Sequence, residues 1–178
     1  MNRRTVIRNI VFISTGATIL PSCLHHDNAA SFPLKNFKLS GDQQDMLADL
    51  SETILPATRS FIGAKDMKAH EFVLKMVDDC FNPDDQKKFT NGLNAFEKFN
   101  KDKFGGSFAR NSMQQKNELL TAVEAKKNVP EEVLNFYSTV KRYTVQCFTS
   151  SKIFMTDIRH YKMVPGSKFK GCVPVKNV

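Results

Sequence analysis

Four helix-start signals are spaced along the chain, and they constrain its fold more than any other feature. A capping box pairs a Ser side chain with a Gln three residues later, and a proline-led start places acids at the positive end of the helix dipole. The signals are the capping boxes Ser40–Gln43 and Ser112–Gln115 and the starts Asn82-Pro83-Asp84-Asp85 and Pro130-Glu131-Glu132. Because each is satisfied within one helical turn, the local sequence alone predicts a helix after each.

Apolar residues at helical spacing follow these signals, and one more such pattern begins at about Asp66. Pro56 and Gly105-Gly106 are the expected ends of the first and third helices. The expected buried faces are Met46, Leu47, Leu50, Ile54 and Leu55; Phe72, Val73, Met76, Val77 and Cys80; Phe89, Leu93, Phe96 and Phe99; Leu119, Leu120 and Val123; and Val133, Phe136, Tyr137, Val140, Tyr143, Thr144 and Cys147. The fold class predicted is all-α, a single-domain bundle of about five helices.

The C-terminal part of the chain, residues 150–178, has a different character. It is aromatic and interrupted by glycine and proline, which predicts an irregular tail on the helical domain of residues 39–178. A segment this apolar must pack either on its own bundle or on a partner subunit. The candidate interface residues are Tyr161, Pro165, Gly166, Phe169, Gly171, Cys172 and Pro174.

Residues 1–22 have the features of an export signal. Arg3 and Arg4 precede a polar residue, two apolar residues and a further base, as in a twin-arginine signal. The apolar stretch Ile10–Leu20 is short for a transmembrane span, which favours a processed signal peptide over a retained anchor. The expected location of the mature protein is the periplasm, attached to a bacterial membrane.

The residues around Cys23 resemble the site at which bacterial lipoproteins are cut and acylated. A small residue, Ser22, precedes the cysteine, with Leu20 two places earlier. Acylation would hold the protein on a membrane surface, with residues 23–38 as a tether. The alternative is cleavage at a nearby small residue such as Ala30.

The net charge of +8 does not indicate nucleic-acid binding. Three of the positive charges belong to Arg3, Arg4 and Arg8, which leaves 8 − 3 = +5 on the mature part. Its lysines are interspersed with acids, as on a solvated helix face, and no nucleic-acid-binding motif accompanies them.

The sequence assigns no catalytic, cofactor-binding or metal-binding residue. There is no glycine-rich loop between a strand and a helix, no C-x-x-C-H haem motif and no cysteine pair at metal-binding spacing. The histidines are His25, His26, His70 and His160; the first two lie in the predicted tether, His70 at a helix start and His160 in the tail. No FAD, NAD or haem site is expected on this chain.

Beyond Cys23, the remaining cysteines are odd in number: Cys80, Cys147 and Cys172. An odd count invites an intermolecular disulfide or a free thiol. Cys80 and Cys147 are expected to be buried on apolar helix faces. Cys172 is the candidate for a covalent link to a partner, with an unpaired or internally bridged thiol as the alternative.

From about Leu47 to Val175 the chain resembles the gluconate 2-dehydrogenase subunit 3 family. The segments that carry the resemblance are Ile54-Leu55-Pro56-Ala57-Thr58, Gly63-Ala64-Lys65-Asp66, His70-Glu71-Phe72, Met76-Val77-Asp78-Asp79, F-T-N-G-L from Phe89 to Leu93, Phe104-Gly105, Phe148-Thr149-Ser150-Ser151 and V-P-G-S-K-F-K-G-C-V-P from Val164 to Pro174. One loop departs from the family pattern: Arg59-Ser60-Phe61-Ile62 replaces the usual Asp-Thr-Pro continuation.

The resemblance implies an accessory subunit. Such subunits accompany a large FAD-dependent sugar or sugar-acid dehydrogenase, often with a cytochrome c subunit, and supply the export signal. The chain would then contribute binding surface and no reaction chemistry. Two other functions are weighed against this: a stand-alone membrane-tethered lipoprotein that binds a ligand or envelope partner, and an enzyme in its own right.

Overall fold

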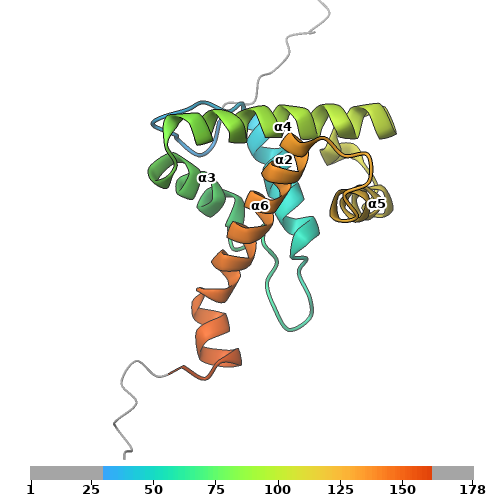
Figure 1. Cartoon of the computed structure of the whole chain (residues 1–178). Coiled ribbons are helices and arrows are strands. Elements are labelled where there is room, and N and C mark those ends of the chain that lie inside the picture. The colour runs from blue at the N-terminus through green and yellow to red at the C-terminus, as the bar shows by residue number, and fades with distance from the viewer. Residues whose placement is uncertain (1–29, 162–178) are drawn as a thin grey trace, which may run out of the picture.

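The computed structural model describes residues 30–161, and these residues form a helical bundle (Figure 1). The elements are α2 (Gly41–Ile54), α3 (Ala69–Cys80), α4 (Pro83–Phe104), the short 3₁₀ turn η1 (Phe108–Arg110), α5 (Met113–Glu124), α6 (Glu131–Thr149) and the π-helical turn η2 (Phe154–Ile158). No strand occurs within the described range. The predicted all-α fold with five main helices is confirmed.

The helix ends are set by the local signals found in the sequence. Both predicted capping boxes form, at Ser40–Gln43 and at Ser112–Gln115. Asn82 accepts a hydrogen bond from the backbone N–H of Asp85 at 2.9 Å. At the other end of α4, Gly105 takes the left-handed conformation with φ 76°.

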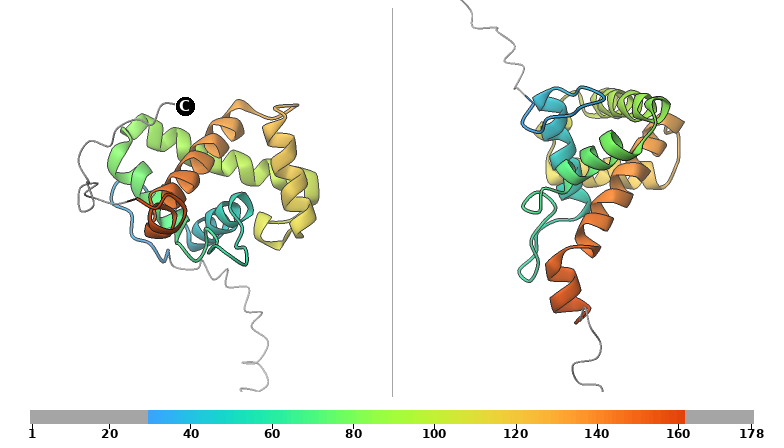
Figure 2. Two further views of the ribbon diagram at one scale, coloured as in Figure 1. Left: turned by 90° about the horizontal axis from the view of Figure 1, so that it is seen from below. Right: turned by 90° about the vertical axis from the view of Figure 1, so that its left-hand side faces the viewer.

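Helix α6 packs against all four other main helices, most extensively against α4 and α3 (Figures 1 and 2). The crossing with α4 is very close: a Cβ added to Gly92 would lie 2.7 Å from the Cβ of Phe136. Leu47, Leu74 and Leu93 are fully buried at the centre of the bundle. The core therefore forms where α2, α3, α4 and α6 meet, with Phe108 and the α5 residues Leu119 and Val123 joining the same cluster.

Helix α3 begins three residues after the predicted start at Asp66. Residues 64–68 form a separate turn, in which the Met67 N–H donates to the Gly63 carbonyl. Lys68 then takes a left-handed conformation, φ 54° and ψ 39°, which interrupts the right-handed helix. The apolar periodicity is correct, but it does not reveal this break.

The prediction of an irregular chain from residue 150 onward is wrong for its first part. Ser151 caps a new helical turn: its hydroxyl accepts from the Phe154 N–H at 3.2 Å and its carbonyl from the Met155 N–H at 3.0 Å. The turn closes when the Arg159 N–H donates to the Phe154 carbonyl, the i→i+5 pattern of a π-helix. Residues 152–158 are therefore helical.

The predicted tether spans residues 23–38, and its C-terminal half packs on the bundle. Phe32, Leu34 and Phe37 lie against the core. The buried carboxylate of Asp78 accepts hydrogen bonds from the N–H groups of Lys35 and Asn36, at 2.9 and 2.8 Å. Folded structure thus begins before residue 39, because buried polar groups in α2 and α3 hold this segment.

Candidate functional site

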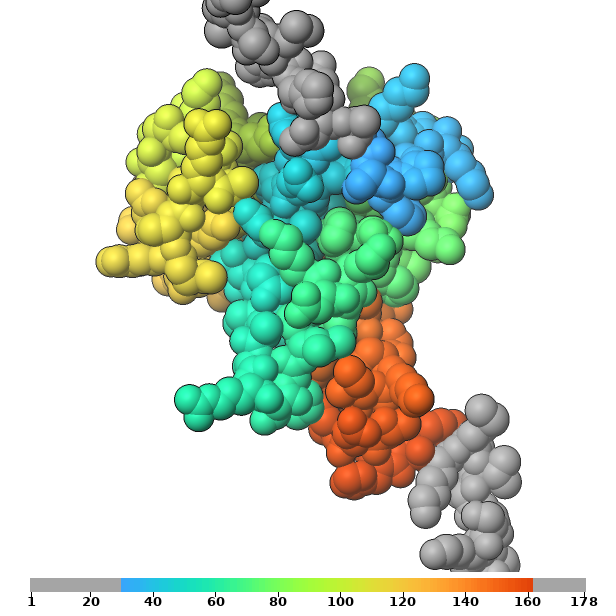
Figure 3. Space-filling view, turned by 180° about the vertical axis from the view of Figure 1, so that it is seen from behind, coloured from blue at the N-terminus to red at the C-terminus, as the bar shows by residue number. Residues whose placement is uncertain are grey.

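The C-terminal part of α6, η2 and the loop between α2 and α3 project together from one side of the bundle (Figures 1 and 3). We call this part, residues 56–63 and 145–161, the apolar protrusion. Large apolar side chains are exposed on it, with exposed fractions between 37% for Phe61 and 57% for Tyr161. The exposed members are Phe61, Ile62, Val145, Ile158 and Tyr161. Such a concentration of apolar surface is typical of a protein-binding site.

Three aromatic rings contact one another in the apolar protrusion. Phe61 from the loop lies edge-on to Phe148 of α6 with ring centroids 6.2 Å apart, and Phe148 lies edge-on to Phe154 of η2 at 5.2 Å. None of the three belongs to the core cluster of the bundle. The apolar protrusion is therefore a satellite cluster, formed by the continuation of α6 and by the loop between α2 and α3.

The loop of the apolar protrusion is held by a carboxylate of α2. Glu52 accepts hydrogen bonds from the Ala57 N–H at 2.9 Å and the Lys65 N–H at 2.7 Å. Gly63 lies against this carboxylate, and a Cβ there would clash with its oxygens. These contacts fix both ends of the loop at whose tip Phe61 and Ile62 are exposed.

Of the sequence-predicted interface residues, Tyr161 is the one within the described range. It is exposed at the end of the apolar protrusion, and its N–H donates to the Met155 carbonyl at 2.8 Å. The other predicted site residues lie outside the described residues: Arg3, Arg4, Cys23, Pro165, Gly166, Phe169, Gly171, Cys172 and Pro174.

The loop Arg59–Ile62 contributes to this surface, although the sequence alone predicts no binding surface there. Two consecutive apolar residues, Phe61 and Ile62, in a short loop between Pro56 and Gly63 were the available signal. The sequence pattern of this loop does not predict the contact between Phe61 and Phe148, because Phe148 lies more than eighty residues later in the chain.

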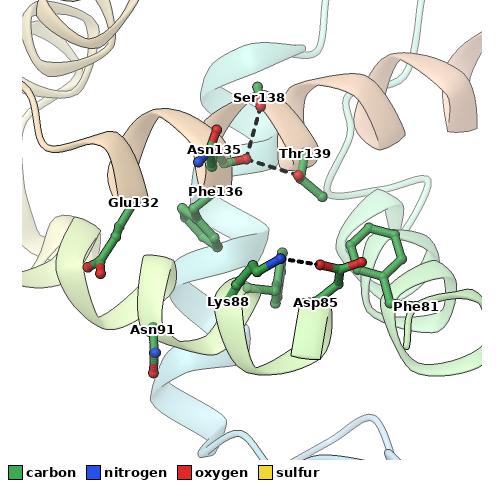
Figure 4. Close-up of a pocket in the computed structure, with 10 residues that line it drawn as sticks. Phe81, Asp85, Lys88, Asn91, Glu132, Asn135, Phe136, Ser138 and Thr139 are labelled. Atoms are coloured by element: carbon green, nitrogen blue, oxygen red, sulfur yellow. Dashed lines mark hydrogen bonds and ion pairs between the residues drawn. The ribbon is translucent and has the colours of Figure 1, made fainter. Parts of the chain in front are cut away.

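A second feature is an open cleft of about 320 Å³ between α4 and α6 (Figure 4). Phe81, Phe89 and Phe136 contribute its apolar lining. Lys88 donates to Asp85 at 2.8 Å and holds the pKa of that carboxyl below its ordinary value, and the hydroxyls of Ser138 and Thr139 both donate to the backbone carbonyl of Asn135. Neither hydroxyl of the cleft is therefore hydrogen-bonded to a side chain that could act as its base among the described residues.

Two further titratable groups are shifted by the fold. His70, the second residue of α3 as predicted, has a buried Nδ1 with no hydrogen-bond partner among the described residues, and burial lowers its pKa. Tyr137 donates to Glu124 at 2.6 Å, and burial together with this bond raises the pKa of its phenol. Within residues 30–161, no three acidic, His or Cys side chains are grouped as metal ligands.

Comparison with known protein families shows to which family the chain is related. The family model for gluconate 2-dehydrogenase subunit 3 matches residues 41–166, which is most of the chain. The chain belongs to the gluconate 2-dehydrogenase subunit 3 family. Neither the curated proteins nor the solved structures contain a significant match.

The match to gluconate 2-dehydrogenase subunit 3 runs through every main helix and through the apolar protrusion. Two of the segments on which the resemblance depends have a clear structural role in this protein. Gly92 in F-T-N-G-L allows α4 to meet α6, and Ser151 caps the turn after α6. The described residues hold no helix with both the length and the apolar character of a membrane span.

The cysteines of this gluconate 2-dehydrogenase subunit 3 member differ from the prediction in one case. Cys80 is exposed, because it is the last residue of α3 and lies outside the core. Cys147 is half-buried in the apolar protrusion, and burial raises the pKa of its thiol. Within residues 30–161 both are free thiols, so neither forms a disulfide with the other.

Proposed function

We propose that this chain is a noncatalytic accessory subunit of an exported, FAD-dependent dehydrogenase that acts on a sugar or sugar acid. Its work is to escort the large catalytic subunit through export and to hold it in the assembled complex. Family membership supports the subunit role. The observation that carries the proposal is the apolar protrusion, since exposed aromatic surface outside the core is costly in water unless a partner covers it.

The chemistry of the complex would then belong to other subunits. FAD would be bound by the large subunit and haem, where present, by a cytochrome c subunit. In this proposal the chain supplies the export signal and the membrane attachment of the complex. Arg3 and Arg4 direct export, and acylated Cys23 retains the complex at a membrane surface.

The location of the protrusion also supports an interface built with the C-terminal tail. The exposed Tyr161 leads directly into the segment that contains Pro165, Phe169 and Pro174. We propose that a partner seated on the apolar protrusion also binds this segment.

Co-purification tests the proposal. The full-length chain, tagged at its C-terminus, is expressed together with the genes that neighbour its own, and the membrane fraction is solubilised and purified through the tag. We expect a flavin-containing protein to be recovered in equal amount, recognised by its flavin absorbance. A chain recovered alone, as a stable monomer, would instead support the stand-alone lipoprotein.

A further inference from the structure

The loop at the tip of the apolar protrusion is a built structure. Thr58 organises its turn, with its N–H donating to the Phe61 carbonyl at 2.9 Å and its hydroxyl accepting from the Phe61 N–H at 3.1 Å. Glu52 fixes the loop ends, and Lys65 is bound to Asp49 of α2 at 2.9 Å. A loop ordered in this way presents Phe61 to a partner with little further loss of conformational entropy.

Charged residues around the apolar protrusion are predominantly basic. Arg59, Lys152 and Arg159 are exposed and have no ion-pair partner within the described part of the chain. The acid in this region, Asp157, accepts from the hydroxyl of Thr156 at 2.6 Å. An apolar centre with unpaired cations around it is complementary to an apolar depression with carboxylates around it.

We propose that the loop Arg59–Ile62, braced by Phe148, is the element that selects the partner: it enters an apolar depression rimmed by carboxylates on the large dehydrogenase subunit. This inference rests on the proposed function and specifies its interface. Phe61 and Ile62 supply the buried centre of the contact, and Arg59, Lys152 and Arg159 supply its charged rim.

The test compares three variants, two of them full-length and one truncated, in the co-expression system described above. The first, F61S/I62S, removes the apolar centre, and its matched control is M113S, an equally apolar exposed residue at the start of α5. The second, R59E/K152E/R159E, reverses the rim, and its matched control is K87E/K98E/K127E, which reverses three exposed lysines on other helices and turns. The third ends the chain after Tyr161. Thermal unfolding of each purified chain accompanies the recovery.

We expect F61S/I62S to weaken recovery of the flavin subunit at least about tenfold, as for a hot-spot aromatic. The rim reversal should weaken it at low salt and lose its effect at about 1 M salt, where the Debye length is about 3 Å. Both controls should recover the wild-type amount. The unfolding temperatures of the variants with substitutions at exposed side chains should stay near the wild-type value. This result would separate loss of binding from loss of folding.

Three results would overturn the inference while leaving the proposed function intact. One is wild-type recovery of the flavin subunit by F61S/I62S; another is equal loss by M113S. The third is greater recovery by the chain ended after Tyr161, which would mean that residues 162–178 cover this surface themselves. If the wild-type chain recovers no flavin protein but forms a homodimer that F61S/I62S dissolves, both the inference and the proposed function fail.

Discussion

Gly92 of α4 faces Phe136 of α6 so closely that a methyl group on Gly92 would lie 2.7 Å from the Phe136 Cβ. The same methyl group would lie 2.8 Å from the carbonyl oxygen of Glu132. Backbone and Cβ atoms cannot rotate away, so the two helices would have to separate.

Gly92→Ala should therefore destabilise the chain by about 1–3 kcal/mol, the usual cost of overpacking a core. Gly106→Ala is the matched control, because nothing lies within 4 Å of a Cβ at that position. Urea unfolding followed by circular dichroism measures both. Equal stability of the two variants would show that the helix crossing is looser than the structure indicates.

Glu52→Gln should loosen the loop of the apolar protrusion. Each carboxylate oxygen of Glu52 accepts one backbone N–H, whereas a glutamine offers one acceptor and turns an amide donor toward the second N–H. We expect a loss of about 1 kcal/mol and faster amide exchange at Ala57 and Lys65.

Glu118→Gln is the control for this variant, since Glu118 makes one exposed ion pair with Lys103 and should change stability by less than about 0.5 kcal/mol. Hydrogen exchange measured by NMR reports the loop directly. Unchanged exchange at Ala57 in the Glu52 variant would mean that the loop is held by other contacts.

Asp78→Ala should release the segment that precedes α2. The buried carboxylate holds the N–H groups of Lys35 and Asn36, so its removal leaves two donors without their partner. We expect a destabilisation of about 1–3 kcal/mol and rapid proteolysis near residues 33–38. In the neighbouring control Asp79→Ala, only an exposed ion pair to Lys35 is lost, and the cleavage pattern should stay as in the wild type.

Stability should fall as the pH drops through the range in which His70 titrates. Burial lowers its pKa from 6.5, against the opposing influence of Glu71 and Asp45 and with a minor contribution from Lys68 and Lys65. Between the lowered pKa and about 6.5 the unfolded chain binds more protons than the folded one, so stability is full above this window and is lost as the pH falls through it.

His70→Gln should flatten that part of the pH profile, because a glutamine side chain does not titrate. The measurement is the urea midpoint as a function of pH, with the His70 ring proton titrated by NMR in the wild type. A His70 pKa at or above 6.5 would contradict the prediction.

How much of this fold follows from sequence is clear from the helix ends. Ser40, Asn82 and Ser112 cap their helices as their local patterns predict, since both partners of each cap lie within four residues. The observed start of α3 differs from the predicted one because no local pattern indicates the left-handed Lys68, and the cap at Ser151 lies in a segment that its glycines and prolines predict to be irregular.

The sequence by itself determined which stretches are helices, where most of them begin and end, and to which family the chain is similar. The tertiary structure decided which residues contact one another and which remain exposed. It paired Asp78 with the segment before α2, brought Gly92 against Phe136, left Cys80 exposed and set Phe61 beside Phe148. The physical reason is distance along the chain: a cap is completed within one turn, whereas burial depends on side chains many residues away, whose positions follow only from how the helices pack.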